Sequence, residues 1–280
     1  MKHIVCYSGG HSSALVAIEV VRKYGKDDVI LMNHNITSKV EHEDIKRFKR
    51  EVAQYLGMKI TYENMKDWET KTPLEVCLEA SAWKIGQKNA ICTSRMKTEP
   101  FHRFLAREFT VEPGEIRDDV IIYYGFDANE GKRITRKVGI MASMGYKTAY
   151  PLADPNWERT IHNTEDTGPM GSGIQRPITY ELFKHANCFP CLKAGMQHWF
   201  MLYCFDYDEF VKHRDAEDII GYSIIKDHYL KDIECKFKAM KDLMIEPTEK
   251  LHHNTFWSRA KKALEEEFGD LEAIPCDCSF

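Results

Sequence analysis

The sequence has no long hydrophobic run and no strong excess of either charge. No apolar stretch reaches the roughly 20 residues that a membrane-spanning helix needs, and residues 1–25 lack the apolar core of a signal peptide. The 39 basic and 43 acidic residues give a formal charge of −4, so no overall basic field indicates nucleic acid. We therefore expect a cytoplasmic protein without a membrane partner, in which any contact with nucleic acid uses a local basic patch.

Internal repeats and low-complexity blocks are also absent, as are the dinucleotide fingerprint GxGxxG and the P-loop GxxxxGK[ST]. The conventional nucleotide motifs are thus not supported. The cysteine count is nine, and this odd number leaves at least one thiol unpaired. In a cytosolic protein such cysteines are buried thiols, metal ligands or redox groups rather than a disulfide framework. Hydrophobic residues make up 43% of the 280, which is enough for a full core.

Strand-like and helix-like segments alternate over the first half of the chain. Short apolar runs predict strands at residues 3–7, 28–33, 58–63 and 120–125. Apolar spacing predicts helices at residues 12–24, 41–56, 72–85, 96–109 and 130–144. This alternation predicts an α/β fold over residues 1–155, a doubly wound parallel sheet of Rossmann-like type. Residues 156–280 begin with a loop rich in Gly and Pro and continue as a mainly helical C-terminal lobe.

The stretch SGGHSS, residues 8–13, joins the first predicted strand to the first predicted helix. Backbone N–H groups at a helix start, together with glycines, form a cradle for an anion. In an open α/β sheet such a loop lies at the carboxyl ends of the strands, where ligands bind. A tight turn with capping serines and no ligand explains the same residues equally well. The loop alone does not decide between the two.

Three segments in order resemble one family. YSGGHSSALVA is similar to the SGG-x-D-S loop of the PP-loop ATP pyrophosphatases, in the adenine nucleotide alpha-hydrolase superfamily. ICTSRMKTEPFHRFL resembles the Cys-Thr-x-x-x-Lys-x-x-Pro element of the phosphoadenylylsulfate (PAPS) reductase-like branch, with Cys92, Lys97 and Pro100 on the pattern. YYGFDANEGKRI resembles its Gly-x-Arg-x-x-Glu-x-x-Arg element. The resemblance covers roughly residues 3–200 and implies a sheet of HUP, or PP-loop, type.

The resemblance implies that ATP or an adenylylated substrate lies over the strand ends. It implies that Ser8, Gly9, Gly10, Ser12 and Ser13 contact the phosphates and that His11, in the same loop, also belongs to the nucleotide site. It places adenosine beside Asn33, His34 and Asn35, and puts Gly125, Glu130 and the cations Lys97 and Arg133 at the same site. Two positions depart from the family: Ser12 replaces the loop aspartate, and Asp127 replaces an arginine. The first departure weakens the case for Mg²⁺-assisted cleavage of ATP, and the second removes a cation.

Cysteines form the second candidate site. Cys188 and Cys191 have C-x₂-C spacing, which suits a zinc ion, an iron–sulfur cluster or a redox dithiol. The resemblance adds Cys92 and implies a three-cysteine [4Fe–4S] cluster with one open iron. Zinc with a fourth ligand such as His185, or free cysteines without metal, are the alternatives. Near the end of the sequence, Cys276 and Cys278 are candidate nucleophiles or cluster ligands, or are incidental cysteines of a tail.

The resemblance thus predicts adenylation of a substrate followed by sulfur transfer. The acceptor stays open among tRNA, DNA, a free nucleotide and a small metabolite, and a sulfur donor or a thioredoxin-like protein would be a partner. A sulfonucleotide reductase that releases sulfite is one alternative. A catalytically silent nucleotide-binding module stabilised by zinc is another, supported by Ser12. The oligomeric state is open, a homodimer included.

Overall fold

The structure is a computed structural model that describes residues 1–66, 68–85, 89–168, 171–186 and 188–269. The chain forms two compact units, and both are discontinuous in sequence. The first consists of Met1–Thr70 and Arg95–Thr179, and the second of Lys71–Ser94 and Tyr180–Phe280. The segment 71–94 therefore belongs with the C-terminal helices, and the loop after residue 155 belongs with the sheet.

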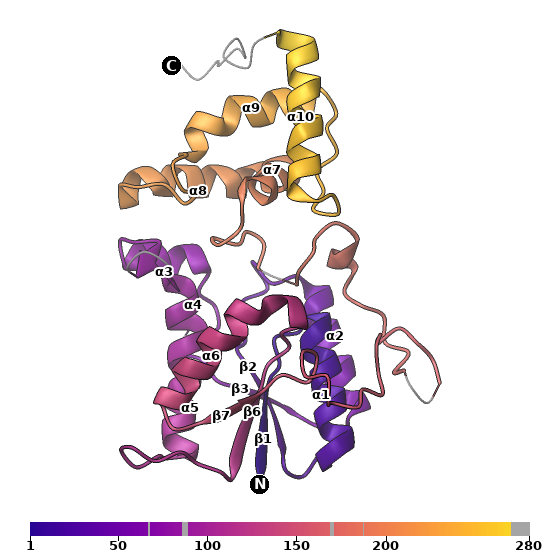
Figure 1. Cartoon of the computed structure of the whole chain (residues 1–280). Coiled ribbons are helices and arrows are strands. Elements are labelled where there is room, and N and C mark those ends of the chain that lie inside the picture. The colour runs from indigo at the N-terminus through magenta and orange to yellow at the C-terminus, as the bar shows by residue number, and fades with distance from the viewer. Residues whose placement is uncertain (67, 86–88, 169–170, 187, 270–280) are drawn as a thin grey trace. The chain divides into compact units, whose positions relative to one another are not determined.

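A five-stranded parallel sheet is the centre of the first unit, with the strand order β3-β2-β1-β6-β7 (Figure 1). Its strands are β1 (Lys2–Cys6), β2 (Val29–Asn33), β3 (Ile60–Tyr62), β6 (Val120–Tyr123) and β7 (Lys147–Ala149). Central β1 aligns Val5 with Leu31 on one side and with Tyr123 on the other. The predicted α/β fold with a doubly wound, Rossmann-like sheet is confirmed.

Helices cover both faces of this sheet. They are α1 (His11–Tyr24) and α2 (Glu43–Tyr55) with one core cluster, and α5 (Glu99–Glu108) and α6 (Gly131–Ser143) with the other. Adjacent residues of β1 point to opposite faces: Val5 packs in the cluster with Phe48 of α2, and Ile4 in the cluster with Phe104 of α5. Burial on both faces explains why the strands read as continuous apolar runs.

The order of the strands reverses at β1. From β1 the chain builds β2 and β3 on one side, then returns to place β6 and β7 on the other. The loops that follow β1 and β6 therefore leave neighbouring strands and diverge, which opens a crevice at their carboxyl ends. Two of the helices begin with a short turn of another type. A π-helical turn η1 (Ser94–Thr98) precedes α5, and a 3₁₀ turn η2 (Ala128–Glu130) precedes α6.

The second unit is mainly helical, as expected. It contains α3 (Pro73–Glu79), the antiparallel pair β4 (Lys84–Ile85) and β5 (Asn89–Ala90), α4 (Ile91–Thr93), α7 (Met196–Phe205), α8 (Tyr207–Ile220), α9 (Leu230–Asp242) and α10 (His253–Phe268). The 3₁₀ turn η3 (Ile178–Glu181) leads into its C-terminal part. Buried Trp83 joins the two segments of this unit: its backbone N–H donates to the Tyr222 hydroxyl at 2.7 Å, and its indole N–H donates to the Tyr222 carbonyl at 2.8 Å.

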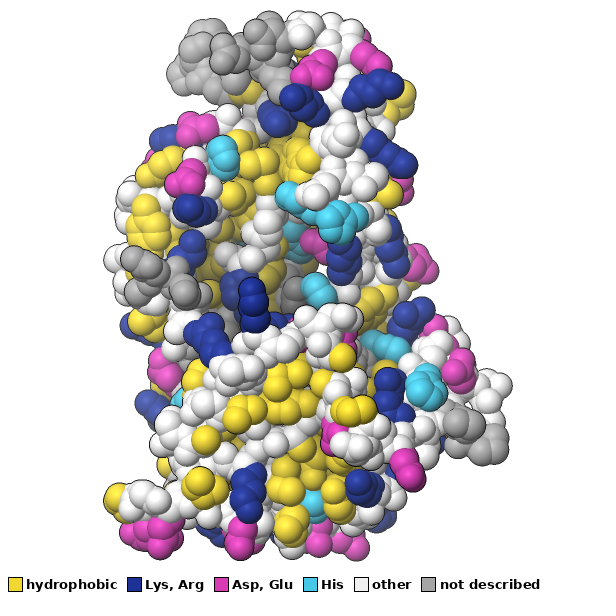
Figure 2. Space-filling model, in the orientation of Figure 1, with side chains coloured by type: hydrophobic (Ala, Val, Ile, Leu, Met, Phe, Trp, Pro, Cys, Tyr) yellow, Lys and Arg dark blue, Asp and Glu magenta, His cyan; other side chains and the backbone are white. Residues whose placement is uncertain are grey.

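The surface of the first unit is partly apolar. On the face that Figure 2 presents, hydrophobic side chains gather among scattered charges on this unit. Val138 and Ile140 of α6 are 43% and 37% exposed, whereas Met141 of the same helix is fully buried. The helix α6 is thus only half covered by the sheet. No helix in the described ranges is long and apolar enough to cross a membrane.

Candidate functional site

The predicted glycine loop lies between β1 and α1. Gly10 is the N-cap of α1, and no side chain caps the first turn from that position. The Ser13 hydroxyl donates to the Gly10 carbonyl at 2.8 Å, and the Ser8 hydroxyl donates to Ser13 at 3.2 Å, while Ser12 stays exposed. The residues predicted to contact phosphate, and His11 beside them, therefore all lie at the start of α1: Ser8, Gly9, Gly10, Ser12 and Ser13.

A side chain from α2 explains why residue 9 is glycine. Gly9 has φ +85°, and a Cβ there would lie 2.6 Å from Cγ and 2.7 Å from Cδ of Lys49. The group that passes close to this backbone is therefore the aliphatic stem of a buried lysine. Gly9 thus permits close internal packing beneath the loop.

Gly125 meets the same loop from the other side of the crevice. It follows β6, and a Cβ on it would come within 2.9 Å of the Ser13 nitrogen and 3.1 Å of the Ser12 carbonyl oxygen. Only a residue without a side chain lets the loop after β6 contact the first turn of α1. Gly125, predicted at the same site, thus lies directly against the backbone of the glycine loop.

Beneath the loop lies a buried ion pair that sequence analysis missed. Lys49 Nζ is 2.6 Å from Glu41 Oε2 and 3.5 Å from Asn33 Oδ1, and Lys49 is 1% exposed. Burial lowers the pKa of the Lys49 ammonium, and the Glu41 carboxylate acts in the opposite direction. Lys49 occupies the apolar stripe of α2, four residues after Ile45 and three before Val52. A charge inside such a stripe was the available signal.

A pocket of about 170 Å³ opens at the carboxyl ends of β1 and β2. Its polar lining includes the predicted Ser8, Asn33, His34 and Lys97, together with Glu41 and Lys137. Its apolar lining includes Met32, Ile36, Phe101 and Tyr124. This volume is below the roughly 300 Å³ at which pockets for drug-sized ligands begin. The pocket is therefore large enough for only part of such a ligand.

The loop after β2 is held in place by two residues near β3. His34 Nδ1 donates to the Glu63 carbonyl at 2.5 Å, and burial lowers the pKa of His34 to about 4. The imidazole is therefore neutral at pH 7 and keeps Nε2 as an acceptor. Asn35 exchanges two hydrogen bonds with the Asn64 amide, at 2.9 and 2.8 Å. His34 lines the pocket, whereas Asn35 is not among the lining residues.

The pocket holds two ammonium groups and one thiol. Lys97 comes from η1 and Lys137 from α6, so two separate elements supply positive charge. Burial lowers the pKa of Lys137, whose Nζ lies 5.1 Å from the centre of the Tyr124 ring. Burial raises the pKa of Cys6 to about 12, so its thiol is protonated at neutral pH and is a poor nucleophile. The pocket lining thus carries two ammonium groups and, in Glu41, one carboxylate.

Glu130 and Arg133 lie on the start of α6 and are not among the residues that line the pocket. The Asp127 side chain accepts from the Asn129 N–H, and the Glu130 side chain accepts from the Asp127 N–H, which forms a capping box. Arg133 pairs with Glu130 and lies 4.3 Å from the centre of the Phe126 ring. Asp127, one of the two departures from the family, thus has a structural role as a helix cap.

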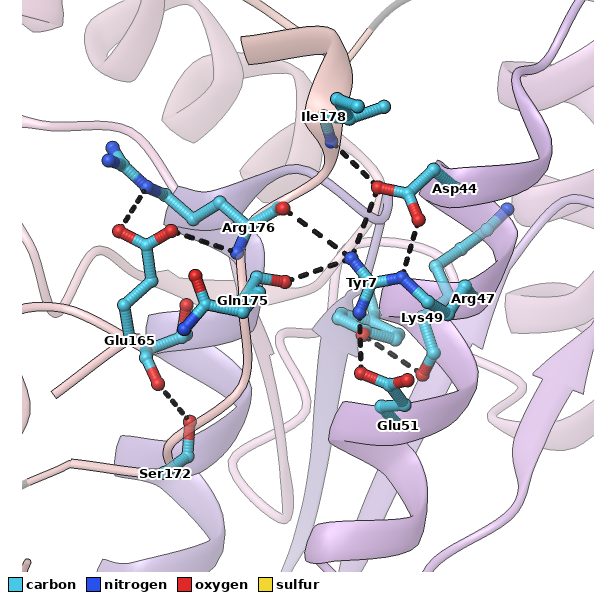
Figure 3. A network of polar contacts seen from close by, with 11 residues as sticks. Tyr7, Asp44, Arg47, Lys49, Glu51, Glu165, Ser172, Gln175, Arg176 and Ile178 are labelled. Atoms are coloured by element: carbon cyan, nitrogen blue, oxygen red, sulfur yellow. Dashed lines mark hydrogen bonds and ion pairs between the residues drawn. The ribbon is translucent and has the colours of Figure 1, made fainter. Parts of the chain in front are cut away.

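Residues 157–168 and 171–178 form a strap along α1 and α2. The buried Glu19 carboxylate accepts the N–H groups of Thr160 and Ile161, both at 2.7 Å. Arg47 donates to the carbonyls of Gln175 and Arg176, as Figure 3 shows. The same view shows Asp44 of α2 accepting the Ile178 N–H at 2.6 Å.

The strap also reaches the glycine loop: the Thr164 N–H donates to His11 Nε2 at 3.3 Å. Burial lowers the pKa of His11, and the nearby Arg176 lowers it further. His11 therefore accepts a hydrogen bond from the strap, which joins residue 164 to the first turn of α1.

The candidate metal ligands Cys92, Cys188 and Cys191 all belong to the second unit and are half-buried. Cys92 lies in α4, and Cys188 and Cys191 flank a turn that contains the cis peptide bond Phe189–Pro190. Within the described ranges, no group of three or more His, Cys, Asp or Glu side chains is arranged to hold a metal ion. Cys276 and Cys278 lie outside the described residues.

Comparison with known proteins gives no match: no family model, no curated protein and no solved structure is significantly similar to the chain. The resemblance to the PP-loop family therefore remains a prediction that rests on its three sequence motifs.

Proposed function

We propose that the first unit binds an adenine nucleotide, with the base and ribose in the pocket and the phosphates reaching from its two lysines to the loop of residues 8–13. One observation carries the proposal. The pocket at the strand ends includes Ser8 of the loop and two lysines, Lys97 and Lys137, in its lining. A polyanion with a flat apolar end matches this combination of loop N–H groups, ammonium groups and apolar side chains.

The reaction that we propose follows from the PP-loop resemblance. An acceptor oxygen attacks the α-phosphorus of ATP, the bond to the β-phosphate bridging oxygen breaks, and pyrophosphate leaves. Sulfide from a donor then attacks the carbon that bears the new AMP ester, and AMP departs with the carbon–oxygen bond pair. Lys97 and Lys137 would stabilise negative charge that grows on the phosphate oxygens. The protein would thus be a PAPS reductase-like sulfurtransferase.

A silent nucleotide-binding module is the second candidate, and two observations favour it. Ser12 stands in the loop in place of the family aspartate, and its side chain is exposed. Arg133, the expected second cation, is 64% exposed and already paired with Glu130. Such a module would bind the nucleotide without cleaving it.

Calorimetry with matched lysine variants tests the binding. We expect ATP to bind the wild-type protein and Lys137→Gln to weaken it roughly tenfold or more, because a hydrogen bond to a charged group is lost. Lys132→Gln is the control, since Lys132 is exposed on the same helix, five residues earlier. An equal loss of ATP affinity in both variants, or no heat of ATP binding with the wild-type protein, would refute the proposed site.

Incubation with labelled ATP and candidate acceptors then separates the reactions. AMP and pyrophosphate that appear only with an acceptor support adenylation and sulfur transfer. Release of sulfite from an adenylylsulfate supports the reductase, and unchanged ATP despite tight binding supports the silent module. Iron and zinc content after anaerobic purification, compared between wild type and Cys188→Ala, tests the expected cluster independently.

A further inference from the structure

The proposed nucleotide pocket contains a buried carboxylate that the proposed reaction does not use. Glu41 lines the pocket and is 7% exposed. Its Oε2 is paired with Lys49, which is not itself part of the lining. Glu41 thus belongs both to the pocket lining and to the buried ion pair. A buried carboxylate is costly unless it is paired and hydrogen-bonded, and Oε1 still has acceptor capacity.

Contacts from the ends of β1 and β2 fix the position of Glu41. The Lys49 stem packs against Gly9 of the loop after β1, and Lys49 Nζ contacts Asn33 at the end of β2. Asn33 in turn donates its side-chain N–H to the Tyr7 carbonyl. The Tyr7 hydroxyl donates to the Lys49 carbonyl at 3.1 Å. This closed set of contacts holds the carboxylate at one place relative to the loop and the pocket.

We propose that Glu41 accepts hydrogen bonds from the ribose hydroxyls, so that the site selects adenine ribonucleotides whose 2′ and 3′ hydroxyls carry no phosphate. This inference rests on the proposed nucleotide site. In a doubly wound sheet, a nucleotide with its phosphates on the loop after the first strand places its ribose toward the end of the next strand. An acidic side chain there matches a free hydroxyl, whereas a sugar phosphate requires a cation such as arginine.

Two charge arguments support this selectivity. A hydroxyl donates to a carboxylate in a charge-assisted hydrogen bond. A phosphate in the same place would put two anions in contact inside a partly buried pocket, where their repulsion is screened less than in water. The substrate class is thereby narrowed to ATP or a 5′-adenylylated compound, and a 3′-phosphorylated adenylylsulfate is disfavoured.

Competition binding tests the inference with three probes: AMP, 2′,3′-dideoxy-AMP and 3′-phosphoadenosine 5′-phosphate. We expect the wild-type protein to bind AMP at least about tenfold more tightly than either analogue. Glu41→Gln should remove most of the preference against the 3′-phosphate. The double variant Glu41→Gln with Lys49→Met removes both charges, so it tests the same point if the single variant fails to fold.

The outcomes separate the two proposals. Absence of binding to AMP and ATP by the wild type would overturn the nucleotide site and this inference together. Binding of AMP and of its 3′-phosphorylated analogue with equal affinity would overturn the inference alone. The same conclusion would follow if both folded variants kept the wild-type preference. Lys46→Met is the matched control for Lys49→Met, because Lys46 lies on the same helix and does not line the pocket.

Discussion

Alanine at position 9 should destabilise the first unit through Lys49. Gly9 has φ +85°, a conformation that costs an L-residue roughly 1–2 kcal/mol. The new methyl group would lie 2.6 Å from Lys49 Cγ, so the buried stem has to shift, at about 1–3 kcal/mol for overpacking. We therefore expect Gly9→Ala to lower the free energy of unfolding by roughly 2–5 kcal/mol in a urea titration followed by circular dichroism.

A double-mutant cycle isolates the contact. In a Glu41→Gln, Lys49→Ala background the stem is absent, and the paired charge is removed with it. The cost of Gly9→Ala should then fall to the backbone part alone, roughly 1–2 kcal/mol. If the cost is the same in both backgrounds, Lys49 is not the reason that residue 9 is glycine, and our account of the loop is wrong.

Three further predictions concern other contacts. Tyr222→Phe removes the hydroxyl that accepts the Trp83 backbone N–H. It should lower the free energy of unfolding of the second unit by about 1–3 kcal/mol in a urea titration. No loss would contradict the assignment of residues 71–94 to that unit. Glu19→Ala frees the two N–H groups that hold the strap, so limited proteolysis within residues 157–178 should accelerate, and an unchanged rate would refute this anchoring. Because burial lowers the pKa of His34 from 6.5 to about 4, the unfolded chain binds a proton in that pH range that the folded chain does not. The free energy of unfolding should therefore decrease as the pH is lowered from 6.5 to 4. His34→Asn should make this decrease smaller, which urea midpoints measured at several pH values would show. An equal pH dependence in the variant would contradict its assignment to His34.

The sheet could be predicted because each parallel strand is buried on both faces and reads as an apolar run. The predicted strand at residues 3–7 matches β1, and the run at 120–125 contains β6. The expected helix at 72–85 was wrong in length, since α3 ends at Glu79. Ser81 has φ +48°, and the chain then turns so that Trp83 enters the core of the second unit. That end depends on tertiary contacts, which local spacing does not contain.

The candidate site was predicted in part. Loop residues and strand ends such as Ser8 and His34 could be found, because motif and topology place them at one edge of the sheet. For Lys49 the only signal was a charge inside the apolar stripe of α2. Glu41 could not be found, because a buried pair is defined by a contact between two segments and a single charge reads as exposed. The sequence alone does not explain why residue 127 is an aspartate. The structure does, because the Asp127 side chain caps the turn before α6.

Amide hydrogen exchange with and without ATP tests the central claim most directly, because it reads the loop N–H groups themselves. We predict that saturating ATP slows exchange at residues 9–14, while the amides of α9 in the second unit do not change. Unchanged exchange throughout residues 9–14, under conditions where calorimetry shows ATP to be bound, would contradict the placement of the phosphates on this loop.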